Sequence, residues 1–154
     1  VLKEATVLTK EGEILTLSAE ELELGYRTSN VIKCGYTVLG GTISLKEGEP
    51  SEIKKQMDEY TLARKTKQPL ELPSAGSTFK RPEGYFAGKL IDDAGLRGYQ
   101  VGGARVSDKH CGFVVNQENA TAKDVLQLIE DVQKTVKEKF GVDLEPEVKR
   151  VGKF

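Results

Sequence analysis

One long segment near the C-terminus, ATAKDVLQLIEDVQKTVKEKFG over residues 120–141, constrains the fold more than any other. Its apolar side chains recur at intervals of three and four residues, which places them on one face of an α-helix. These side chains belong to Val125, Leu128, Ile129, Val132, Val136 and Phe140. Gly141 is typical of a residue that ends a helix. A helix with one apolar face needs another element to cover it, so the segment predicts a packed domain.

Short β-prone runs occupy the first third of the chain. Residues 5–9 and 13–17 are separated by a short polar stretch, which predicts a hairpin. Ser18 and Glu21 have the spacing of a capping box, which predicts a short helical turn. Residues 30–45 are rich in β-branched side chains and contain glycines, which predicts one or two strands with a bulge.

Helical and β-prone segments alternate in the rest of the chain. Residues 50–68 predict a helix that joins an N-terminal β-rich part to a C-terminal α/β part. Residues 84–98 predict a short helix that stops at a glycine, and residues 110–116 predict a buried strand. Residues 142–152 predict a final strand, because apolar and charged side chains are interspersed. This alternation predicts an α+β fold.

Composition excludes several classes of protein. No apolar run approaches the ~20 residues that span a bilayer, and the net charge of −1 gives no bulk attraction to nucleic acid. Cys34 and Cys111 lack CxxC spacing and fit a reducing cytoplasm, although a disulfide between them stays open. Because His110 is the only histidine, a His-rich metal site is excluded and we expect no metal.

The chain begins at Val1, with a sequence typical of the middle of a strand, which predicts a fragment of a longer protein.

Ser77 is the first candidate for chemistry, because it follows a glycine in LPSAGSTFKRP and precedes two cations. A serine nucleophile needs a base such as His110, and GxSxG is absent, so a hydrolase is disfavoured. A phosphate cradle that includes Lys80 and Arg81 is more consistent with the sequence, although it lacks the P-loop pattern. Taken alone, the stretch is most simply a turn that requires Gly76.

Other polar residues have both a chemical and a structural interpretation. Glu145 and Glu147 lie two apart on the expected strand and so project to one face, with Pro146 marking an edge position. A buried glutamate can act as a catalytic acid, whereas most charges at a strand end are simply solvated. Arg27, beside Tyr26, has a planar guanidinium that suits binding of a carboxylate or phosphate. The alternative is an ordinary surface arginine.

Lys67 and His110 complete the set of candidates. Lys67 falls at a helix end, where a cation complements the helix dipole without any further role. His110 follows the paired glycines of GGARVSDKH and is either a ligand-binding donor or a structural histidine. Residue chemistry alone therefore indicates a soluble α+β protein and leaves open whether these residues form an anion site.

The order of five segments is more specific than any single residue. They are GYRTSN, KQPLELPSAGSTFKRP, GYFAGKLIDDAGLRGYQVGGARVSDKHCGFVVN, ATAKDV and LEPEVKRVG. Together they resemble the UDP-N-acetylenolpyruvoylglucosamine reductases, the MurB family of bacterial peptidoglycan synthesis. The resemblance covers nearly the whole chain, and the compact run from Gly84 to Gly103 is similar to the shorter, type II form.

The resemblance implies a cytoplasmic FAD-dependent NADPH oxidoreductase, a UDP-N-acetylmuramate dehydrogenase. Enzymes of this family reduce the enolpyruvyl group of UDP-N-acetylglucosamine enolpyruvate to give UDP-N-acetylmuramate, which serves cell wall biogenesis, cell shape and cell division. NADPH reduces FAD, the flavin passes hydride to the enolpyruvyl β-carbon, and a serine then protonates the α-carbon. Neither nucleic acid nor membrane is implied as a partner.

The family pattern also implies roles for particular residues. Ser77 matches the proton-donating serine, and Glu147 matches a glutamate that stabilises the intermediate or assists protonation. Arg27 matches an arginine that polarises the substrate carboxylate, with Tyr26 beside it. Lys67 matches a lysine that contacts substrate.

Three further residues are implied to face the substrate. His110 falls where the family often has a polar residue on the substrate side. Lys80 and Arg81 are interpreted as cations that line the site or face the diphosphate. Cys111 lies where relatives often have a small residue, so we assign it no role.

Enzymes of this family are about twice as long as this chain, so the resemblance implies a C-terminal portion. Residues 1–49 would be the remnant of the FAD-binding, PCMH-like domain, 50–68 a linker helix and 69–154 an α/β substrate-binding domain. Most cofactor-binding residues would then lie in the missing N-terminal half, the implied partner of this chain. We expect the chain alone to bind FAD weakly or not at all and to be inactive. The alternative is a truncated, inactive UDP-sugar-binding module.

Overall fold

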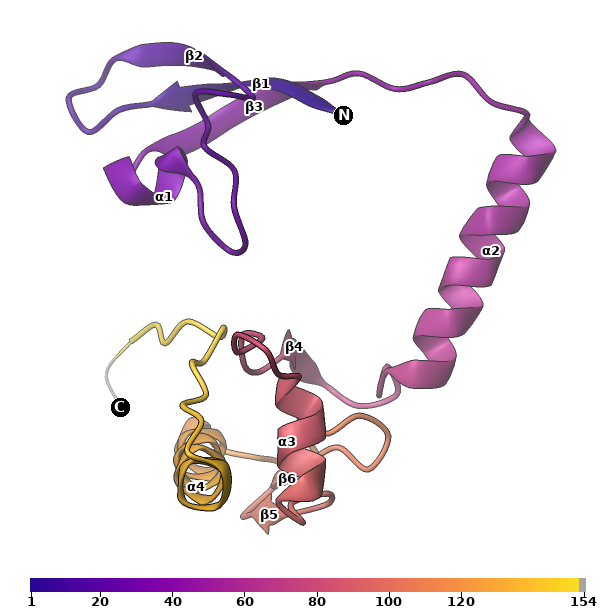
Figure 1. Cartoon of the computed structure of the whole chain (residues 1–154), viewed down its shortest axis with the longest axis vertical. Coiled ribbons are helices and arrows are strands. Elements are labelled where there is room, and N and C mark those ends of the chain that lie inside the picture. Colours follow the sequence, from indigo (N-terminus) through magenta and orange to yellow (C-terminus); the bar gives the residue numbers. More distant parts are fainter. Residues whose placement is uncertain (153–154) are drawn as a thin grey trace. The chain divides into compact units, whose positions relative to one another are not determined.

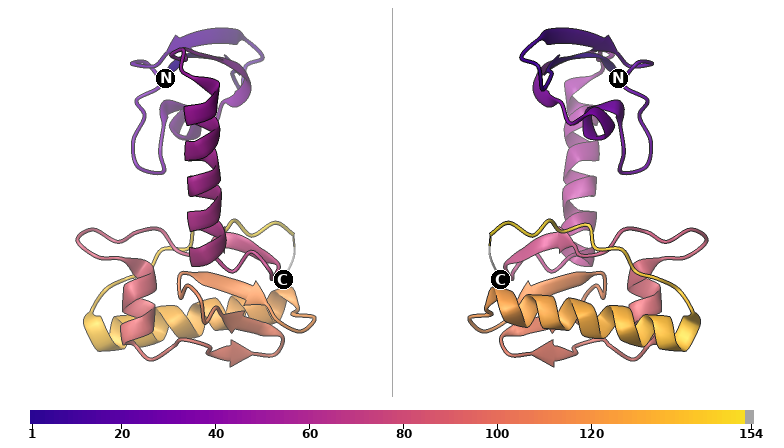
Figure 2. Two further views of the ribbon diagram at one scale, coloured as in Figure 1. Left: turned by 90° about the vertical axis from the view of Figure 1, so that its right-hand side faces the viewer. Right: turned by 90° about the vertical axis from the view of Figure 1, so that its left-hand side faces the viewer.

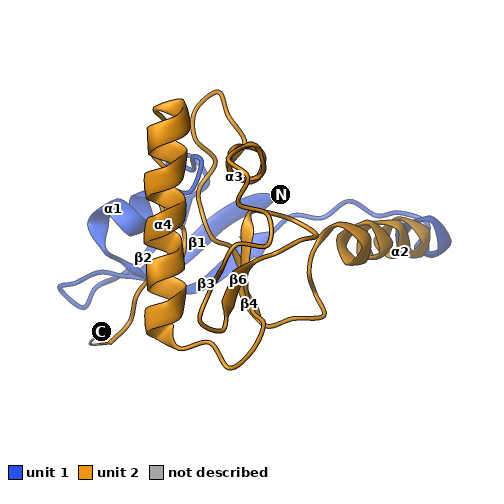
Figure 3. Ribbon diagram, turned by 90° about the horizontal axis from the view of Figure 1, so that it is seen from below, with its two compact units in different colours: residues 1–53 blue, residues 54–154 orange. Residues whose placement is uncertain are grey.

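The computed structural model describes residues 1–152 and divides the chain into two compact units, Val1–Ile53 and Lys54–Phe154 (Figure 3). Its helices and its strands except β7 are labelled in Figure 1. The division falls inside α2 (Pro50–Lys67), the helix expected over residues 50–68. In α2 no residue is buried, and its apolar side chains Ile53, Met57 and Tyr60 are all exposed.

Unit 1 contains a three-stranded antiparallel sheet in the order β2-β1-β3. The expected hairpin is confirmed as β1 (Leu2–Leu8) and β2 (Ile14–Ser18). Ser18 and Glu21 form the expected reciprocal cap, because the backbone N–H of Ser18 donates to Glu21 Oε2 at 2.8 Å and that of Glu21 donates to Ser18 Oγ at 3.3 Å.

The expectation for residues 30–45 is half wrong. Asn30–Cys34 forms the short helix α1 rather than a strand. Gly35 ends this helix with a left-handed φ of 68°, and its N–H donates to the Ile32 carbonyl at 3.3 Å while the N–H of Tyr36 donates to the Val31 carbonyl at 2.9 Å. The expected strand follows as β3 (Thr37–Ile43), and its register against β1 is irregular, as a bulge requires. A glycine read as part of a strand is thus the stop signal of a helix.

The core of unit 1 is small. Its buried apolar residues are Ala5, Val7 and Leu22, with a few partly buried neighbours. Every residue of β3 is exposed, and the side chains of Val38, Leu39 and Ile43 are more than half exposed. An edge strand that presents apolar side chains and unpaired backbone groups is prone to pair with another chain.

We therefore expect the isolated chain to self-associate through β3. Sedimentation at rising protein concentration should show a growing fraction of dimer or larger species. Leu39→Lys should shift that equilibrium toward the monomer by about tenfold, because charge on an edge strand opposes pairing. Thr37→Lys adds the same charge to the same strand without removing apolar surface, so it should have the smaller effect. A monomer at every concentration would contradict this expectation.

Unit 2 is built on a four-stranded sheet in the order β4-β7-β6-β5. The strands are β4 (Ser74–Ser77), β5 (Gln100–Val101), β6 (Ala104–Val106) and β7 (Phe113–Asn116). All its neighbouring strands are antiparallel, which corrects the α/β label for this part of the chain, since α/β folds have mainly parallel sheets. The α+β class of the whole chain is confirmed.

Helices α3 (Ala87–Asp93) and α4 (Ala122–Phe140) pack together and share the core of unit 2 with this sheet (Figure 2). The expected apolar face of α4 is confirmed by its buried residues, which are Leu128, Ile129, Val132 and Val136. A capping box between Thr121 and Asp124 begins α4, and Gly141 ends it with a φ of 70°. Phe140, at the last turn, is partly exposed.

Within residues 1–152, no helix is long and apolar enough to cross a bilayer. The same residues contain no group of three or more His, Cys, Asp and Glu side chains arranged to hold a metal ion. Cys34 and Cys111 are both free thiols.

Candidate functional site

Ser77 lies at a β-bulge, where β4 pairs with β7. Ser74 pairs with Val115 and Ser77 pairs with Phe113, so two residues of β4 face one residue of β7. One of the two is Gly76, whose φ of 84° is left-handed, and no atom lies within 4 Å of the position a Cβ would take. The glycine is therefore required by backbone conformation rather than by crowding. The bulge leaves Ser77 exposed at the end of the strand.

Glu147 lies next to this strand, although the final strand expected over residues 142–152 does not form. Within the described part of that segment, Pro146 makes only an isolated bridge with Phe79. Pro146 has no N–H, so it fits a position where the flanking residues make the hydrogen bonds. The N–H of Glu147 donates to the Thr78 carbonyl at 2.8 Å. The main chain of Glu147 is thereby held beside the residue that follows Ser77.

Lys80 and Glu145 are the next pair of residues beside the Phe79–Pro146 bridge. The N–H of Lys80 donates to the Glu145 carbonyl at 2.8 Å, and the Lys80 ammonium forms an ion pair with Glu145 Oε1. Opposite residues of an antiparallel pair project to the same face, which explains the ion pair. Glu145 and Glu147 therefore differ, since Glu145 is paired with Lys80 and exposed whereas Glu147 is half-buried.

Arg81 lies over an aromatic ring. Its guanidinium carbon is 3.9 Å from the centroid of the Phe86 ring, and its Nε donates to the Tyr85 carbonyl at 3.2 Å. Stacking on an aromatic face orients a guanidinium. Arg81 is thus an oriented cation four residues after Ser77.

His110 lies on the loop before β7, near the partner of Ser77. Its ring packs edge-on against Phe113, with 5.1 Å between centroids, and Phe113 pairs with Ser77. The N–H of Gly112 donates to His110 Nδ1 at 3.0 Å, so Nδ1 acts as the acceptor and Nε2 is the ring nitrogen that can donate. His110 therefore presents a donor at Nε2.

Lys67 is the last residue of α2 and is exposed. Near Lys67, the end of α2 is contacted by Lys109. The Lys109 ammonium donates to the Lys65 carbonyl at 2.8 Å and forms an ion pair with Glu71 at 3.3 Å. Lys109 therefore ties the loop of His110 to the end of α2. Sequence reasoning gave no role to Lys109 or Glu71, although both lie within the segments that carry the family resemblance.

Tyr26 and Arg27 belong to unit 1. They are the central residues of a tight turn in which Gly25 and Thr28 exchange backbone hydrogen bonds of 3.0 and 3.3 Å. Arg27 has a φ of 56°, which is uncommon for a residue with a side chain, and its guanidinium stacks on Tyr26 at 5.1 Å. Backbone strain of this kind is often found at functional sites.

The structure therefore brings part of the expected site together. Five of the expected residues lie on neighbouring segments of unit 2: Ser77, Lys80, Arg81, His110 and Glu147. Sequence reasoning missed Thr78, which joins these segments: its N–H donates to the Gly112 carbonyl at 2.8 Å, and its Oγ1 accepts from the Val114 N–H at 3.1 Å. Thr78 is buried, so its hydroxyl supports the strand.

Cys111, next to His110, is buried, and desolvation raises the pKa of its thiol. A thiol with a raised pKa is a poor nucleophile at neutral pH. This agrees with assigning Cys111 no chemical role.

Comparison with known proteins gives the family. The model of the family "UDP-N-acetylenolpyruvoylglucosamine reductase, C-terminal domain" matches residues 68–151. This match covers more than half of the chain and includes the whole cluster around Ser77. The chain belongs to the UDP-N-acetylenolpyruvoylglucosamine reductase family and corresponds to its C-terminal part.

Curated relatives extend the match to the whole chain. UDP-N-acetylenolpyruvoylglucosamine reductase of Lachnoclostridium phytofermentans is 66% identical over 151 residues, which are 98% of this chain and 49% of the relative. The enzyme of the same name from Agathobacter rectalis is 62% identical over 154 residues, which are 100% of this chain and 49% of the relative. The chain therefore spans about half the length of the curated relatives it matches.

A solved structure of a relative also matches the chain. The crystal structure of UDP-N-acetylenolpyruvylglucosamine reductase (MurB) from Thermus caldophilus matches with a TM-score of 0.78 and 39% identity. The match covers 95% of this chain and 52% of that one. The resemblance noted from sequence motifs is thus confirmed at the level of the family.

Proposed function

We propose that this chain supplies the substrate side of a UDP-N-acetylenolpyruvoylglucosamine reductase. The reaction is the reduction of the enolpyruvyl ether of UDP-N-acetylglucosamine enolpyruvate to the lactyl ether of UDP-N-acetylmuramate, a step of peptidoglycan synthesis. FAD, reduced by NADPH, supplies the hydride when it is bound. Family membership and the names of the relatives support this proposal.

In this proposal the chain's own residues donate a proton to the α-carbon and stabilise the negative charge on the substrate carboxylate. Hydride addition to the β-carbon leaves a carbanion-like enolate, which is basic enough to take a proton at the α-carbon from the Ser77 hydroxyl. Glu147 assists that transfer, and the guanidinium of Arg27 stabilises charge on the substrate carboxylate. No histidine is needed to activate Ser77, because it acts as an acid and not as a nucleophile.

The remaining candidates orient the substrate. Arg81, stacked on Phe86, and the Nε2–H of His110 are donors suited to the diphosphate or sugar. Lys67 and Tyr26 are proposed as further substrate contacts. Lys80 is paired with Glu145, so in this proposal it holds the segment of Glu147 in place and adds positive charge near the site.

Little in the chain fits a flavin diphosphate. The sequence contains no two glycines separated by one residue, so it lacks the G-x-G pattern of dinucleotide-binding loops. We propose that residues 1–49 complete a flavin-binding domain whose main part lies elsewhere, that 50–68 link the parts, and that 69–154 bind substrate. The chain alone is then expected to bind FAD weakly or not at all and to have no reductase activity.

One observation carries this proposal. The bulge at Gly76 exposes the Ser77 hydroxyl, while the hydrogen bond from Glu147 N–H to the Thr78 carbonyl brings a carboxylate-bearing segment to the same place. A proton donor and an acidic partner on neighbouring segments suit protonation of a short-lived carbon base.

A hybrid reductase tests the proposal. In it, this chain replaces the matching half of the Agathobacter rectalis relative, to which it is 62% identical throughout. We expect the hybrid to bind FAD and to oxidise NADPH only when UDP-N-acetylglucosamine enolpyruvate is present. The isolated chain should do neither, as judged by flavin absorbance after gel filtration.

Two outcomes would contradict the proposal. A folded, flavin-bound hybrid without turnover would exclude this chain as the substrate side, and a stoichiometric yellow complex of the isolated chain would refute the expected dependence on the other half. The alternative, an inactive UDP-sugar-binding module, predicts that UDP-N-acetylglucosamine raises the melting temperature of the isolated chain although the hybrid stays inactive.

A further inference from the structure

The imidazole ring of His110 lies against two glycines. A Cβ added at Gly88, on α3, would lie 3.2 Å from His110 Cε1, and a Cβ added at Gly112 would lie 3.0 Å from the same atom. Both distances are shorter than the ~3.5–4.0 Å of an ordinary contact between carbon atoms. Neither glycine has a left-handed φ, so the backbone conformation does not require glycine at these positions. What requires it is space, and this space between Gly88 and Gly112 is a glycine slot for the ring.

Hydrogen bonds and an aromatic contact fix the ring within the glycine slot. The Gly112 N–H donates to His110 Nδ1 at 3.0 Å, so Nε2 is left as the ring nitrogen that can donate to another group. Phe113 packs edge-on against the ring at an interplanar angle of 73°, and its N–H donates to the His110 carbonyl at 3.0 Å. His110 is nevertheless exposed, so the ring stays open to a ligand.

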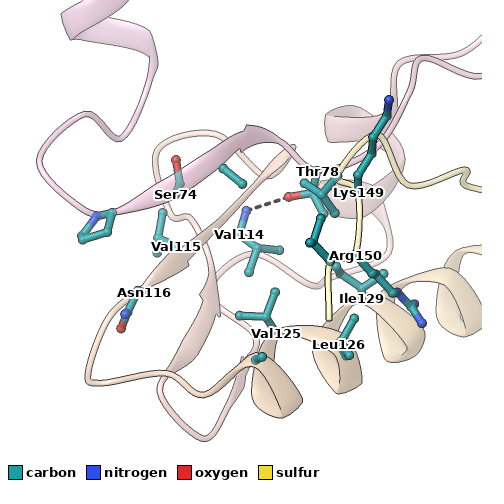
Figure 4. A pocket seen from close by; sticks show the side chains of 15 residues that line it. Ser74, Thr78, Val114, Val115, Asn116, Val125, Leu126, Ile129, Lys149 and Arg150 are labelled. Atoms are coloured by element: carbon teal, nitrogen blue, oxygen red, sulfur yellow. Dashed lines mark hydrogen bonds between the residues drawn. The ribbon is translucent and has the colours of Figure 1, made fainter. Parts of the chain in front are cut away.

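The glycine slot is joined to the strand end that carries Ser77. The Gly112 carbonyl accepts from the Thr78 N–H at 2.8 Å. The Thr78 hydroxyl accepts from the Val114 N–H at 3.1 Å, as the dashed line in Figure 4 shows. These two bonds hold the chain on either side of Phe113, the residue that pairs with Ser77. The slot therefore gives the ring a defined position relative to the proposed proton donor.

We propose that Gly88 is a positioning residue, which reserves the glycine slot so that His110 Nε2 donates to an acceptor oxygen of the bound UDP-sugar. The inference rests on the proposed function, in which His110 orients the substrate. A methyl group at residue 88 would displace the ring from the Gly112 N–H and leave Nε2 without a fixed direction, whereas the Ser77 hydroxyl would keep its place. Substrate binding should therefore depend on Gly88, and proton transfer should not.

The first test is structural and needs neither flavin nor substrate. Because His110 is the only histidine of the chain, the proton on its Cε1 gives a single NMR signal. We expect nuclear Overhauser contacts from this proton to the α-protons of Gly88 and Gly112 in the 154-residue chain. Gly88→Ala should remove the contact to Gly112, whereas Gly95→Ala, just after α3, should keep it. Absence of both contacts in the unsubstituted chain would overturn the slot.

The hybrid reductase tests the effect on substrate. Gly88→Ala should raise KM for UDP-N-acetylglucosamine enolpyruvate about tenfold, in the range of one lost hydrogen bond, and keep kcat within about twofold. His110→Ala should have the same effect. The double variant Gly88→Ala/His110→Ala should be no worse than His110→Ala, because no ring is left to displace. Gly95→Ala strains the backbone without approaching the ring, so it should leave KM unchanged.

Two inhibitors of the hybrid locate the acceptor oxygen. If Gly88→Ala weakens UDP and UDP-N-acetylglucosamine equally, the acceptor belongs to the diphosphate, and if it weakens only UDP-N-acetylglucosamine, the acceptor belongs to the sugar. The inference alone is overturned if the hybrid turns over and Gly88→Ala weakens neither, or if the KM effects of the two single variants multiply in the double variant. A hybrid that binds flavin without turnover overturns both the proposed function and this role of the slot.

Discussion

Replacing Ser77 with alanine in the hybrid reductase is expected to lower kcat for enolpyruvyl reduction by about 10²–10⁴-fold, the usual contribution of a positioned proton donor. The physical reason is that hydride addition stays possible while the enolate loses the hydroxyl that protonates its α-carbon. KM should change little, because one exposed hydroxyl contributes little to ground-state binding. NADPH-dependent bleaching of the flavin, measured without the enolpyruvyl substrate, should remain at the rate of the unsubstituted hybrid.

Two neighbouring hydroxyls serve as controls for this variant. Ser74→Ala alters the same strand at the other end of the bulge and should keep most of the activity, because it removes only a long, exposed hydrogen bond of 3.4 Å from the Gly76 N–H to Ser74 Oγ. Thr78→Ser keeps the hydroxyl that accepts from the Val114 N–H and should also remain active. Ser77→Cys retains an ionisable hydrogen and is expected to recover part of the loss.

The isotope incorporated during turnover gives an independent readout. In D₂O the product of the unsubstituted hybrid should carry deuterium at the α-carbon of the lactyl group, delivered to one face. If Ser77→Ala keeps both the rate and the stereochemistry of this incorporation, another group donates the proton and the role assigned to Ser77 is wrong.

The elements that could be predicted from sequence are those whose signals are local. The apolar spacing of residues 120–141 fixes α4, because no strand could place those side chains on one face, and Gly141 takes the left-handed conformation expected of a helix end. The capping box of Ser18 and Glu21 likewise depends on residues three apart. Such elements need no knowledge of the rest of the fold.

Two errors arose where distant parts of the chain decide the conformation. Residues 30–34 have β-branched side chains but form α1, because Gly35 closes the helix and lets β3 begin later against β1. Residues 142–152 alternate in polarity, yet β4 is short and bulged at Gly76, and within the described residues Pro146 makes only one bridge. Propensity is overridden in both cases by the partner strand.

The candidate site shows the same division. Ser77, Arg81 and His110 could be chosen from residue type and motif, whereas the roles of Thr78 and Glu145 depend on pairing between segments far apart in sequence. Lys80 was expected near substrate on charge alone, and only the structure reveals its ion pair with Glu145. A sequence thus indicates which groups are present more readily than which groups they contact.

The paired glycines of GGARV illustrate a requirement that sequence alone cannot explain. At Gly103 a Cβ would lie 2.1 Å from the Glu118 carbonyl oxygen and 2.5 Å from the Ala120 nitrogen, both backbone atoms. The carbonyl of Gly103 also accepts hydrogen bonds from Gln117 and Glu118 at 2.9 and 3.2 Å. The turn between β5 and β6 is therefore packed against the loop that precedes α4, with no room for a side chain.

Gly103→Ala is accordingly expected to destabilise unit 2 by about 3 kcal/mol or more, at the upper end of overpacking costs. Backbone atoms cannot move aside as a flexible side chain can, so the loop and the start of α4 must shift. The measurement is urea unfolding followed by helical circular dichroism, with the midpoint compared at an unchanged slope.

Gly95→Ala is the matched control, because it makes the same chemical change at a glycine with no atom within 4 Å of the Cβ position. Its φ of 79° costs the alanine about 1 kcal/mol of backbone strain. The two glycine-to-alanine substitutions therefore separate the cost of a clash with backbone atoms, at Gly103, from the cost of a left-handed φ, at Gly95. Equal effects of the two would mean that the loop before α4 yields readily, and that the tight turn at Gly103 does not hold this part of the sheet in place.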